Sequence, residues 1–355
     1  MNNKNTSKYS IEELCNLSLG TLLTKNKNEN GKYKFFTTSK EEFRINSYSY
    51  DCEAILINRS CDVGGVKYYN GKFDVQQKVF VLNNFSKNVL VKYVYYYLKH
   101  KFKNHALKNV KKGAISNLVN NDVLSFVIKI PNLEQQKNII KNLDNLNRLL
   151  NLSEKELELR KRQFNYYLYK LITKENKGKK YKISDICSVK KGESPIKKTP
   201  SGEYHFVTMK KEGATSNKCQ FDCKAVCVPL VSSVGSGVAK INYLFYQEGK
   251  FDLGNILCAL IPKDEEVLNV KYLYYYLYLF KDVKLTTLMR GGANVAMKTD
   301  DVADVKISFP PIEKQKEIVE ILDVFTNYTQ KLEKEIELRK LQLEYYQNQL
   351  LTFDK

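Results

Sequence analysis

Two long segments of the chain, residues 131–173 and 310–355, carry apolar side chains at alternating steps of three and four. This spacing is the heptad pattern of a coiled coil, and it continues for about five repeats. Neither segment contains Gly or Pro after its opening prolines, so nothing in the sequence interrupts a helix. The residues expected to form the seam between the two helices are Leu143, Leu146, Leu150, Leu157, Phe164 and Leu171 in the first segment and Leu322, Phe325, Leu332, Ile336, Leu343 and Leu350 in the second.

The rest of the chain reads as mixed α/β structure. Short apolar runs at 54–57, 79–82 and 124–128 alternate with turns rich in Gly and Asn, which is typical of strands. Two tyrosine-rich segments, 91–98 and 270–277, place Tyr at helical spacing, and we interpret these side chains as core.

The chain is an internal duplication. A shift of 179 residues aligns 131–173 with 310–352 without a gap, and 19 of the 43 pairs are identical. The same shift aligns 91–98 with 270–277, and with small gaps the similarity extends to Gly71-Lys72-Phe73-Asp74 and Gly249-Lys250-Phe251-Asp252. A period of this length indicates two copies of one unit, each a globular part followed by a helix.

Connectivity predicts how the helices pair. The globular part of the second copy follows the end of the first helix and precedes the start of the second, so the two seams can pair only antiparallel. We therefore expect an α+β fold with two similar mixed α/β domains, which are separated by a pair of long antiparallel coiled-coil helices and related by a pseudo-twofold axis. The expected boundaries are 1–130 for the first domain, 131–173 for the first helix, 174–182 for a basic junction, 183–309 for the second domain and 310–355 for the second helix.

Charge adds a partner class to this picture. Lys and Arg number 58 against 39 Asp and Glu, which gives a net charge of +19. Residues 1–130 carry +11 and the junction +4, whereas residues 183–309 carry only +3. This concentration favours a polyanion as the partner, although a merely solvated lysine surface is the alternative interpretation.

The sequence contains no clear motif for catalysis or for cofactor binding. There is no phosphate-binding GxxxxGK[ST] loop, no dinucleotide fingerprint and no tetrapeptide typical of adenine methyltransferases. Glu248-Gly249-Lys250 could belong to a nuclease, but the first copy has Asn70 in place of Glu248. Cys219, Cys223 and Cys227 lie on a strand-like run whose four-residue spacing of about 13 Å is too wide for one metal ion, so we expect free thiols and no metal. The absence of a signal peptide and of an apolar span of about 18 residues predicts a cytoplasmic protein.

The helix signature Pro-[Asn/Pro]-[Leu/Ile]-Glu-x-Gln-Lys-x-Ile, followed by Glu-Leu-Arg-Lys-x-Gln-x-x-Tyr-Tyr, stands at 131–167 and again at 310–346. In this arrangement the whole chain resembles the specificity subunit of a type I restriction–modification system. The resemblance implies a non-catalytic subunit whose two target-recognition domains read the halves of a bipartite double-stranded DNA site. It also implies two methyltransferase subunits, which would carry S-adenosylmethionine, and a nuclease–translocase subunit as a possible further partner. A bivalent coiled-coil adaptor that binds only proteins is the alternative.

Under this hypothesis, basic residues in loops and in the junction are candidate DNA contacts, although each is expected to be a solvated or phosphate-contacting charge more often than a reader of a base edge. They are Lys34, Arg59, Lys67, Lys177, Lys179, Lys180, Lys210, Lys211 and Arg290.

Overall fold

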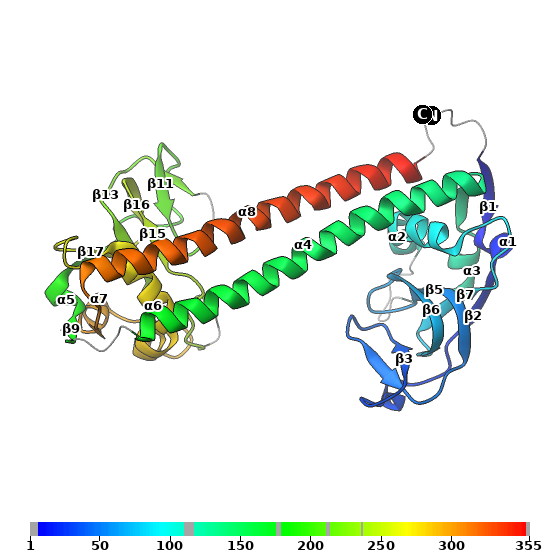
Figure 1. Cartoon of the computed structure of the whole chain (residues 1–355), viewed down its shortest axis with the longest axis horizontal. Coiled ribbons are helices and arrows are strands. Elements are labelled where there is room, and N and C mark those ends of the chain that lie inside the picture. Colours follow the sequence, from blue (N-terminus) through cyan, green and yellow to red (C-terminus); the bar gives the residue numbers. More distant parts are fainter. Residues whose placement is uncertain (1–5, 110–116, 175–178, 211–213, 236, 353–355) are drawn as a thin grey trace. The chain divides into compact units, whose positions relative to one another are not determined.

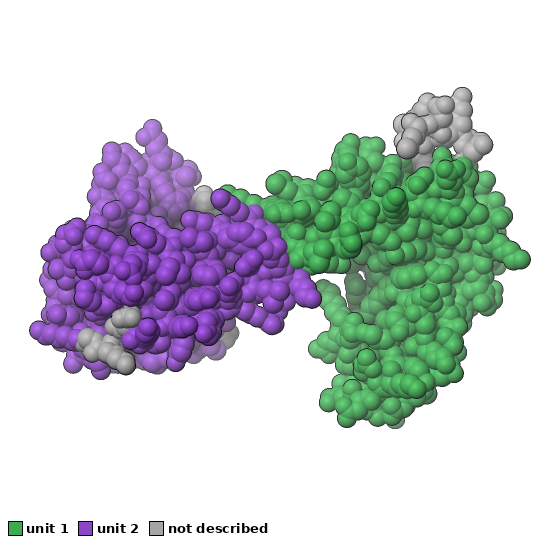
Figure 2. Space-filling view, viewed as in Figure 1, with its two compact units in different colours: residues 1–154, 334–355 green, residues 155–333 purple. Residues whose placement is uncertain are grey.

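A computed structural model describes residues 6–109, 117–174, 179–210, 214–235 and 237–352. The chain divides into two compact units (Figure 2). Unit 1 comprises residues 1–154 and 334–355, and unit 2 comprises residues 155–333. Both long helices are therefore shared by the two units, so the compact units do not follow the boundaries expected between globular parts and helices.

The elements of the first copy form a mixed α/β domain (Figure 1). They are β1 (Ser7–Ser10), α1 (Ile11–Leu14), β2 (Asn16–Leu19), the 3-10 helix η1 (Thr24–Asn26), β3 (Tyr33–Phe36), β4 (Phe43–Ile45), β5 (Tyr50–Asn58), β6 (Val66–Val75), β7 (Val79–Asn83), α2 (Val91–Asn109), α3 (Asn120–Leu124), β8 (Val127–Ile130) and the long helix α4 (Leu133–Lys174).

The second copy follows the same order, except that two short strands replace each of β5 and β6 and that the 3-10 helix comes after the domain helix. Its elements are β9 (Tyr181–Lys182), α5 (Ile183–Ile186), β10 (Cys187–Lys191), β11 (Tyr204–Val207), β12 (Thr215–Ser216), β13 (Phe221–Asp222), β14 (Ala225–Pro229), β15 (Phe245–Gln247), β16 (Lys250–Leu253), β17 (Leu257–Pro262), α6 (Val270–Lys284), the 3-10 helix η2 (Thr286–Leu288), α7 (Thr299–Ala303), β18 (Lys306–Ile307) and the long helix α8 (Ile312–Leu351).

In unit 1, six strands form one sheet in the order β2-β7-β5-β6-β3-β4, in which only β3 and β6 run parallel. A separate pair, β1 and β8, is antiparallel. Helix α2 packs on the sheet, and its Tyr93, Tyr96 and Tyr97 are buried in the same cluster as Ile55 of β5 and Phe80 of β7. The interpretation of this tyrosine stripe as core is therefore confirmed.

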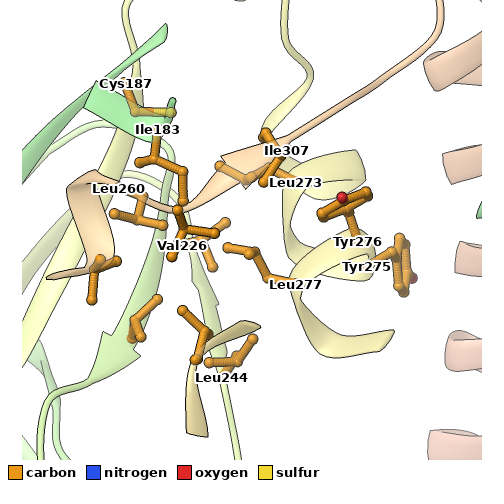
Figure 3. Packing of buried hydrophobic residues seen from close by; sticks show 14 of the residues in the cluster. Ile183, Cys187, Val226, Leu244, Leu260, Leu273, Tyr275, Tyr276, Leu277 and Ile307 are labelled. Carbon is orange, nitrogen blue, oxygen red and sulfur yellow. The ribbon is translucent and has the colours of Figure 1, made fainter. Parts of the chain in front are cut away.

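In unit 2 the corresponding strands form two four-stranded sheets, β10-β17-β14-β15 and β12-β11-β16-β13. The division falls where β13 and β14 are separated by Cys223 and Lys224, opposite Gly249, whose φ of +81° suits glycine. Helix α6 covers the first sheet, and Figure 3 shows Leu273 and Leu277 of α6 directed toward the strand side chains. Tyr272, Tyr275 and Tyr276 of α6 are buried in the same cluster, as expected.

The two long helices begin in related ways. At the start of α4, the Asn132 side chain accepts a hydrogen bond from the Gln135 amide at 2.9 Å, which caps the helix. At the start of α8, Pro311 occupies the equivalent position, and its carbonyl accepts from the Gln315 amide at 3.1 Å. The uninterrupted helices predicted from the heptad pattern are thus present, at 133–174 and 312–351.

Contacts inside each unit show that α4 and α8 run antiparallel. In unit 1, Glu154 of α4 pairs with Lys340 of α8 at 2.9 Å. In unit 2, the later residue Tyr167 of α4 stacks on the earlier residue Phe325 of α8, with ring centroids 5.3 Å apart. The antiparallel coiled-coil architecture expected from connectivity is confirmed.

Two strand predictions were wrong in detail. The run 124–128 does not form one strand, because Leu124 ends α3 and β8 begins only at Val127. The Asp122 carboxylate accepts a hydrogen bond from the Val119 amide at 2.9 Å, which caps α3 and favours helix over strand at this point. The run 221–228 is likewise divided between β13 and β14.

Candidate nucleic-acid interface

The helix pair places its heptad seam largely inside. Leu143, Leu322, Leu332 and Ile336 are at most 6% exposed, as is the flanking Ile139. The other expected seam residues, which are half-buried, are Leu146, Leu150, Leu157, Phe164, Leu171, Phe325, Leu343 and Leu350. Ser153, at a seam position, is also buried. Tyr346, which the heptad pattern also places in the seam, is exposed instead.

The glutamine of the repeated helix signature ties each long helix to its globular part. Gln136 is completely buried: its Oε1 accepts from the Leu90 amide at 2.8 Å, and its Nε2 donates to the carbonyls of Asn88 and Pro131 at 3.1 and 2.8 Å. These bonds join the first turn of α4 to the segment that leads into α2. A buried amide with every partner in place fixes the geometry of this connection.

Gln315 makes the same contacts in unit 2. Its Oε1 accepts from the Asn269 amide at 2.9 Å, and its Nε2 donates to the carbonyls of Val267 and Pro310 at 3.0 and 2.8 Å. The sequence signature thus marks a structural joint. Sequence reasoning used this glutamine only as a family marker, although its recurrence 179 residues later was the signal that could have revealed its role.

Three candidate DNA contacts of unit 1 have partners within the protein. Lys34 pairs with Glu42. The Lys67 ammonium donates to the carbonyls of Thr37 and Ser39 at 3.1 and 2.8 Å, and burial lowers its pKa. Lys67 therefore fastens the loop after β3, and its charge is less available to a nucleic acid than its sequence position suggested.

Arg59 is similarly engaged. Its Nε donates to the carbonyl of Leu118 at 3.0 Å, and its guanidinium lies 6.0 Å from the centroid of the Phe80 ring. The half-buried guanidinium holds the segment before α3 against the sheet. None of these three side chains extends as an isolated cation over a surface of unit 1.

The remaining described candidates are exposed. They are Lys179 and Lys180 of the junction, and Lys210 and Arg290 of unit 2. Among the described residues, none of these four takes part in an ion pair, so each can present its charge to a polyanion. Lys177 and Lys211 lie outside the described residues.

Arg290 belongs to an ordered loop. Its amide donates to the Ala296 carbonyl at 2.7 Å, and the Ala296 amide donates back at 3.0 Å. The adjacent Gly291 has a φ of +131°, and a Cβ there would lie 2.3 Å from the Asn294 carbonyl, so only glycine fits. Asn294 is exposed beside Arg290. Arginine and asparagine are the side chains that most often read guanine and adenine edges.

A second loop lies against this one. Ser232 donates its amide to the Val295 carbonyl at 2.9 Å, and its hydroxyl donates to the Val238 carbonyl at 2.6 Å. The first copy has seven fewer residues between the motifs that flank this loop, Ala54 to Gly71 against Ala225 to Gly249. The two copies therefore share a scaffold and differ in the length of this exposed, hydrogen-bonded loop.

The cysteines show no metal chemistry in the part of the chain that the structure describes, where no group of three His, Cys, Asp or Glu side chains could hold an ion. Burial raises the pKa of Cys187 and Cys258 to about 12 and that of Cys227 well above its usual value. These thiols are core residues. None of the described helices combines the length and apolarity needed to cross a membrane.

Comparisons with known proteins agree with this architecture. The model of the type I restriction modification DNA specificity domain matches residues 3–162 and again 174–340. A candidate type I specificity subunit of Mycoplasma pneumoniae is 27% identical over 364 residues, covering 97% of each chain. The specificity subunit of the Escherichia coli type I restriction enzyme EcoR124I/EcoR124II is 28% identical over 299 residues, which cover 75% of this chain and 72% of that one.

A solved structure shares the fold. The crystal structure of the type I restriction–modification S subunit from M. genitalium superposes with a TM-score of 0.71 at 16% identity, covering 100% of this chain and 98% of that chain. The two matched segments together cover most of the sequence, and each contains a globular part and much of the long helix that follows it. The chain belongs to the family of type I restriction–modification DNA specificity subunits, which do not themselves catalyse methylation or cleavage.

Proposed function

We propose that each globular part reads one half of a bipartite DNA target and that the helix pair sets the separation between the halves. The observation that carries this proposal is the duplication itself: two domains of one fold, each joined to its helix through the same buried glutamine. The longer loop after Ser232 in the second copy supports the idea that the two half-sites have different sequences. Exposed cations at Lys179, Lys180 and Arg290 would contact the DNA.

We further propose that the outer faces of α4 and α8 dock two methyltransferase subunits. Apolar side chains stand exposed on both helices, and two pairs of them are equivalent in the duplication: Leu159 with Leu338, which are 54% and 66% exposed, and Tyr166 with Tyr345, each 59% exposed. Apolar residues at helical spacing on a solvent face are typical of a surface that binds partner helices. S-adenosylmethionine would belong to those partners, since this chain offers no motif for it, and a nuclease–translocase subunit could join the same complex.

Selection from a random duplex library by the full chain, followed by sequencing, tests the DNA proposal. Two short conserved blocks separated by a fixed unread gap are expected. Affinity for the selected duplex should fall steeply with salt, because several lysines displace counterions from phosphate. Selection of nothing, with affinity unchanged between low and moderate salt, would favour the protein-only adaptor instead.

Two variants distinguish contacts to phosphate from contacts to base edges. Replacing Lys179 and Lys180 together by Ala should weaken binding to selected and random duplexes alike. Arg290→Ala should relax one position of one half-site and leave the other half-site unchanged, and its loss is expected to reduce discrimination there roughly tenfold. Lys67→Ala is a useful comparison, since its ammonium already bonds to the carbonyls of Thr37 and Ser39.

A further inference from the structure

A second signature residue, the aspartate eight positions after the glutamine, also connects each helix to its domain. In unit 1, Asp144 of α4 accepts hydrogen bonds on both carboxylate oxygens, from the Lys92 ammonium at 2.6 Å and from the Tyr96 hydroxyl at 2.5 Å. In unit 2, Asp323 of α8 accepts from Lys271 at 2.6 Å and from Tyr275 at 2.7 Å. All six residues are related by the shift of 179 positions.

The connection continues from the domain helix into the sheet. Lys92 lies 5.9 Å from the centroid of the Tyr68 ring, and the Tyr68 hydroxyl donates to Glu53 at 2.5 Å. In unit 2, Lys271 lies 5.4 Å from the Tyr246 ring, and Tyr246 donates to Glu248 at 2.7 Å. Each network therefore runs from the long helix through one lysine to a tyrosine of the strand layer.

The last carboxylate comes from different strand positions in the two copies. Glu53 lies on β5, directly opposite Asn70 of β6, whereas Glu248 occupies the place in the duplication that corresponds to Asn70. The position equivalent to Glu53 is Lys224. The tyrosine–carboxylate bond is thus present in both copies, although residues at different positions supply the carboxylate.

Burial strengthens the hydrogen bonds and ion pairs of these two networks. Tyr96 and Tyr275 are 4% and 3% exposed, and burial together with the neighbouring aspartate raises the pKa of each hydroxyl, so each remains protonated and donates its bond. The aspartate and lysine side chains are between 27% and 38% exposed, so the ion pairs are only partly screened by water. The buried glutamine lies nearer the start of the helix than the aspartate. Together these two polar side chains attach each long helix to its own domain at two points about two turns apart.

We propose that Asp144 and Asp323 are positioning residues that fix the orientation of each recognition domain on its own helix and thereby make the DNA reader selective for one gap length. The inference rests on the proposed reading of a bipartite site. Adding one base pair to the gap moves a half-site by about 3.4 Å and rotates it by roughly 35°. A domain attached to its helix at two points could not reorient to bind the displaced half-site, whereas a domain attached at one point could.

The structural arm of the test uses unit 2 of the full chain without DNA. Nitroxide labels are attached at Asp222→Cys in β13 and Asn327→Cys in α8, with the exposed thiols Cys61 and Cys219 replaced by Ser. Electron–electron distance measurements on the parent should give a narrow distribution. Asp323→Ala and Lys271→Met should broaden it, while Lys271→Arg, which keeps the ion pair, and Glu320→Ala, which removes an exposed carboxylate from the same helix, should not.

The DNA arm uses duplexes that carry both selected half-sites with the gap changed by one base pair. The parent should bind the altered gaps roughly tenfold more weakly, and Asp323→Ala should reduce this penalty to about threefold or less. Affinity for a duplex with one half-site should remain within about twofold, which a general loss of structure would not allow.

The two arms separate the two proposals. If the parent chain selects no bipartite site, the proposed function fails, and the distance measurement still decides the role of Asp323. A distribution in Asp323→Ala as narrow as in the parent, or a gap penalty as sharp, would overturn the positioning role while leaving bipartite reading intact.

Discussion

Lys161 of α4 contacts Glu333 of α8 at 2.6 Å, and the same pair recurs with its partners exchanged between the helices, as Glu154 of α4 with Lys340 of α8 at 2.9 Å. Glu154 is equivalent to Glu333 in the duplication, and Lys161 to Lys340. One interaction thus appears once in each unit, as an antiparallel pair of duplicated helices requires. Because the side chains are 36–57% exposed, these pairs contribute more to register than to stability.

Charge reversal in unit 2 tests this register. Glu333→Lys places two ammonium groups together and should destabilise the helix pair by about 1 kcal/mol or less, with a larger effect at low salt. The exchange Lys161→Glu with Glu333→Lys should restore most of the loss. Urea unfolding of the single and double variants measures the coupling energy, and a double variant no better than the sum of its parts would argue against the pair.

Gln315→Leu should be far more damaging than its modest change in volume suggests. It would leave the Asn269 amide and the carbonyls of Val267 and Pro310 without their buried partner, at a cost of about 2–4 kcal/mol. The expected result is a clear decrease in the urea midpoint of unit 2. Gln330→Leu, on an exposed position of the same helix, is the matched control and should change the midpoint little.

Periodicity and duplication made the architecture predictable from sequence. A seam of apolar residues such as Leu143 and Leu322 specifies which face of a helix is buried, and the order of the segments permits only antiparallel pairing. The boundaries of the strands were harder to predict from the sequence. The sequence around Leu124 is apolar enough for a strand. The bond from the Val119 amide to Asp122 that favours a helix is local, but valine is not a typical N-cap residue, so the helix start was not recognised.

Charge alone could not rank the candidate DNA contacts. Lys34 and Lys67 carry the same charge as Arg290, yet both have partners within unit 1. The turn after β3 brings Glu42 to Lys34, and the pairing of more distant strands brings the Thr37 carbonyl to Lys67. The polar joints were missed for a different reason. Gln136 lies three residues before Ile139, in line with the apolar seam, but its side chain is polar, and only the fold shows that it is completely buried with every partner in place.

A pH dependence is expected at the end of α8 in unit 1. His100 of α2 shares a hydrogen bond of 3.1 Å with the Asn348 side chain, and burial, followed by the neighbouring Lys101, lowers its pKa; Glu344 and the Asn348 bond oppose this shift. A lowered pKa means that the folded state binds a proton less readily than the unfolded state. The contribution of neutral His100 to the stability of the fold is therefore fully present above the unfolded pKa of about 6.5. It is lost as the pH falls through the pKa of His100 in the folded state.

Replacing this histidine removes the titration. The difference in urea midpoint between the parent and His100→Gln should change as pH falls from about 7.5 to 5.5, with the parent losing stability relative to the variant. Glutamine can keep a hydrogen bond to Asn348 without acquiring charge. A constant difference across this range would show that His100 is not the titrating group.

Two leucines of α8 should separate the stability of the helix pair from the binding of partners. Leu332 is 5% exposed in the seam, whereas Leu338, six residues later, is 66% exposed on the outer face. Leu332→Asp would bury an unpaired carboxylate between the helices, and the expected cost is several kcal/mol, visible as a lower melting temperature. Leu338→Asp should leave the melting temperature nearly unchanged, because its side chain already faces water.

If the outer face docks the methyltransferase, Leu338→Asp should nevertheless reduce the co-purification of the methyltransferase with the chain, and the matching Leu159→Asp should do the same from α4. Full retention of the methyltransferase by both exposed variants would place the docking surface elsewhere.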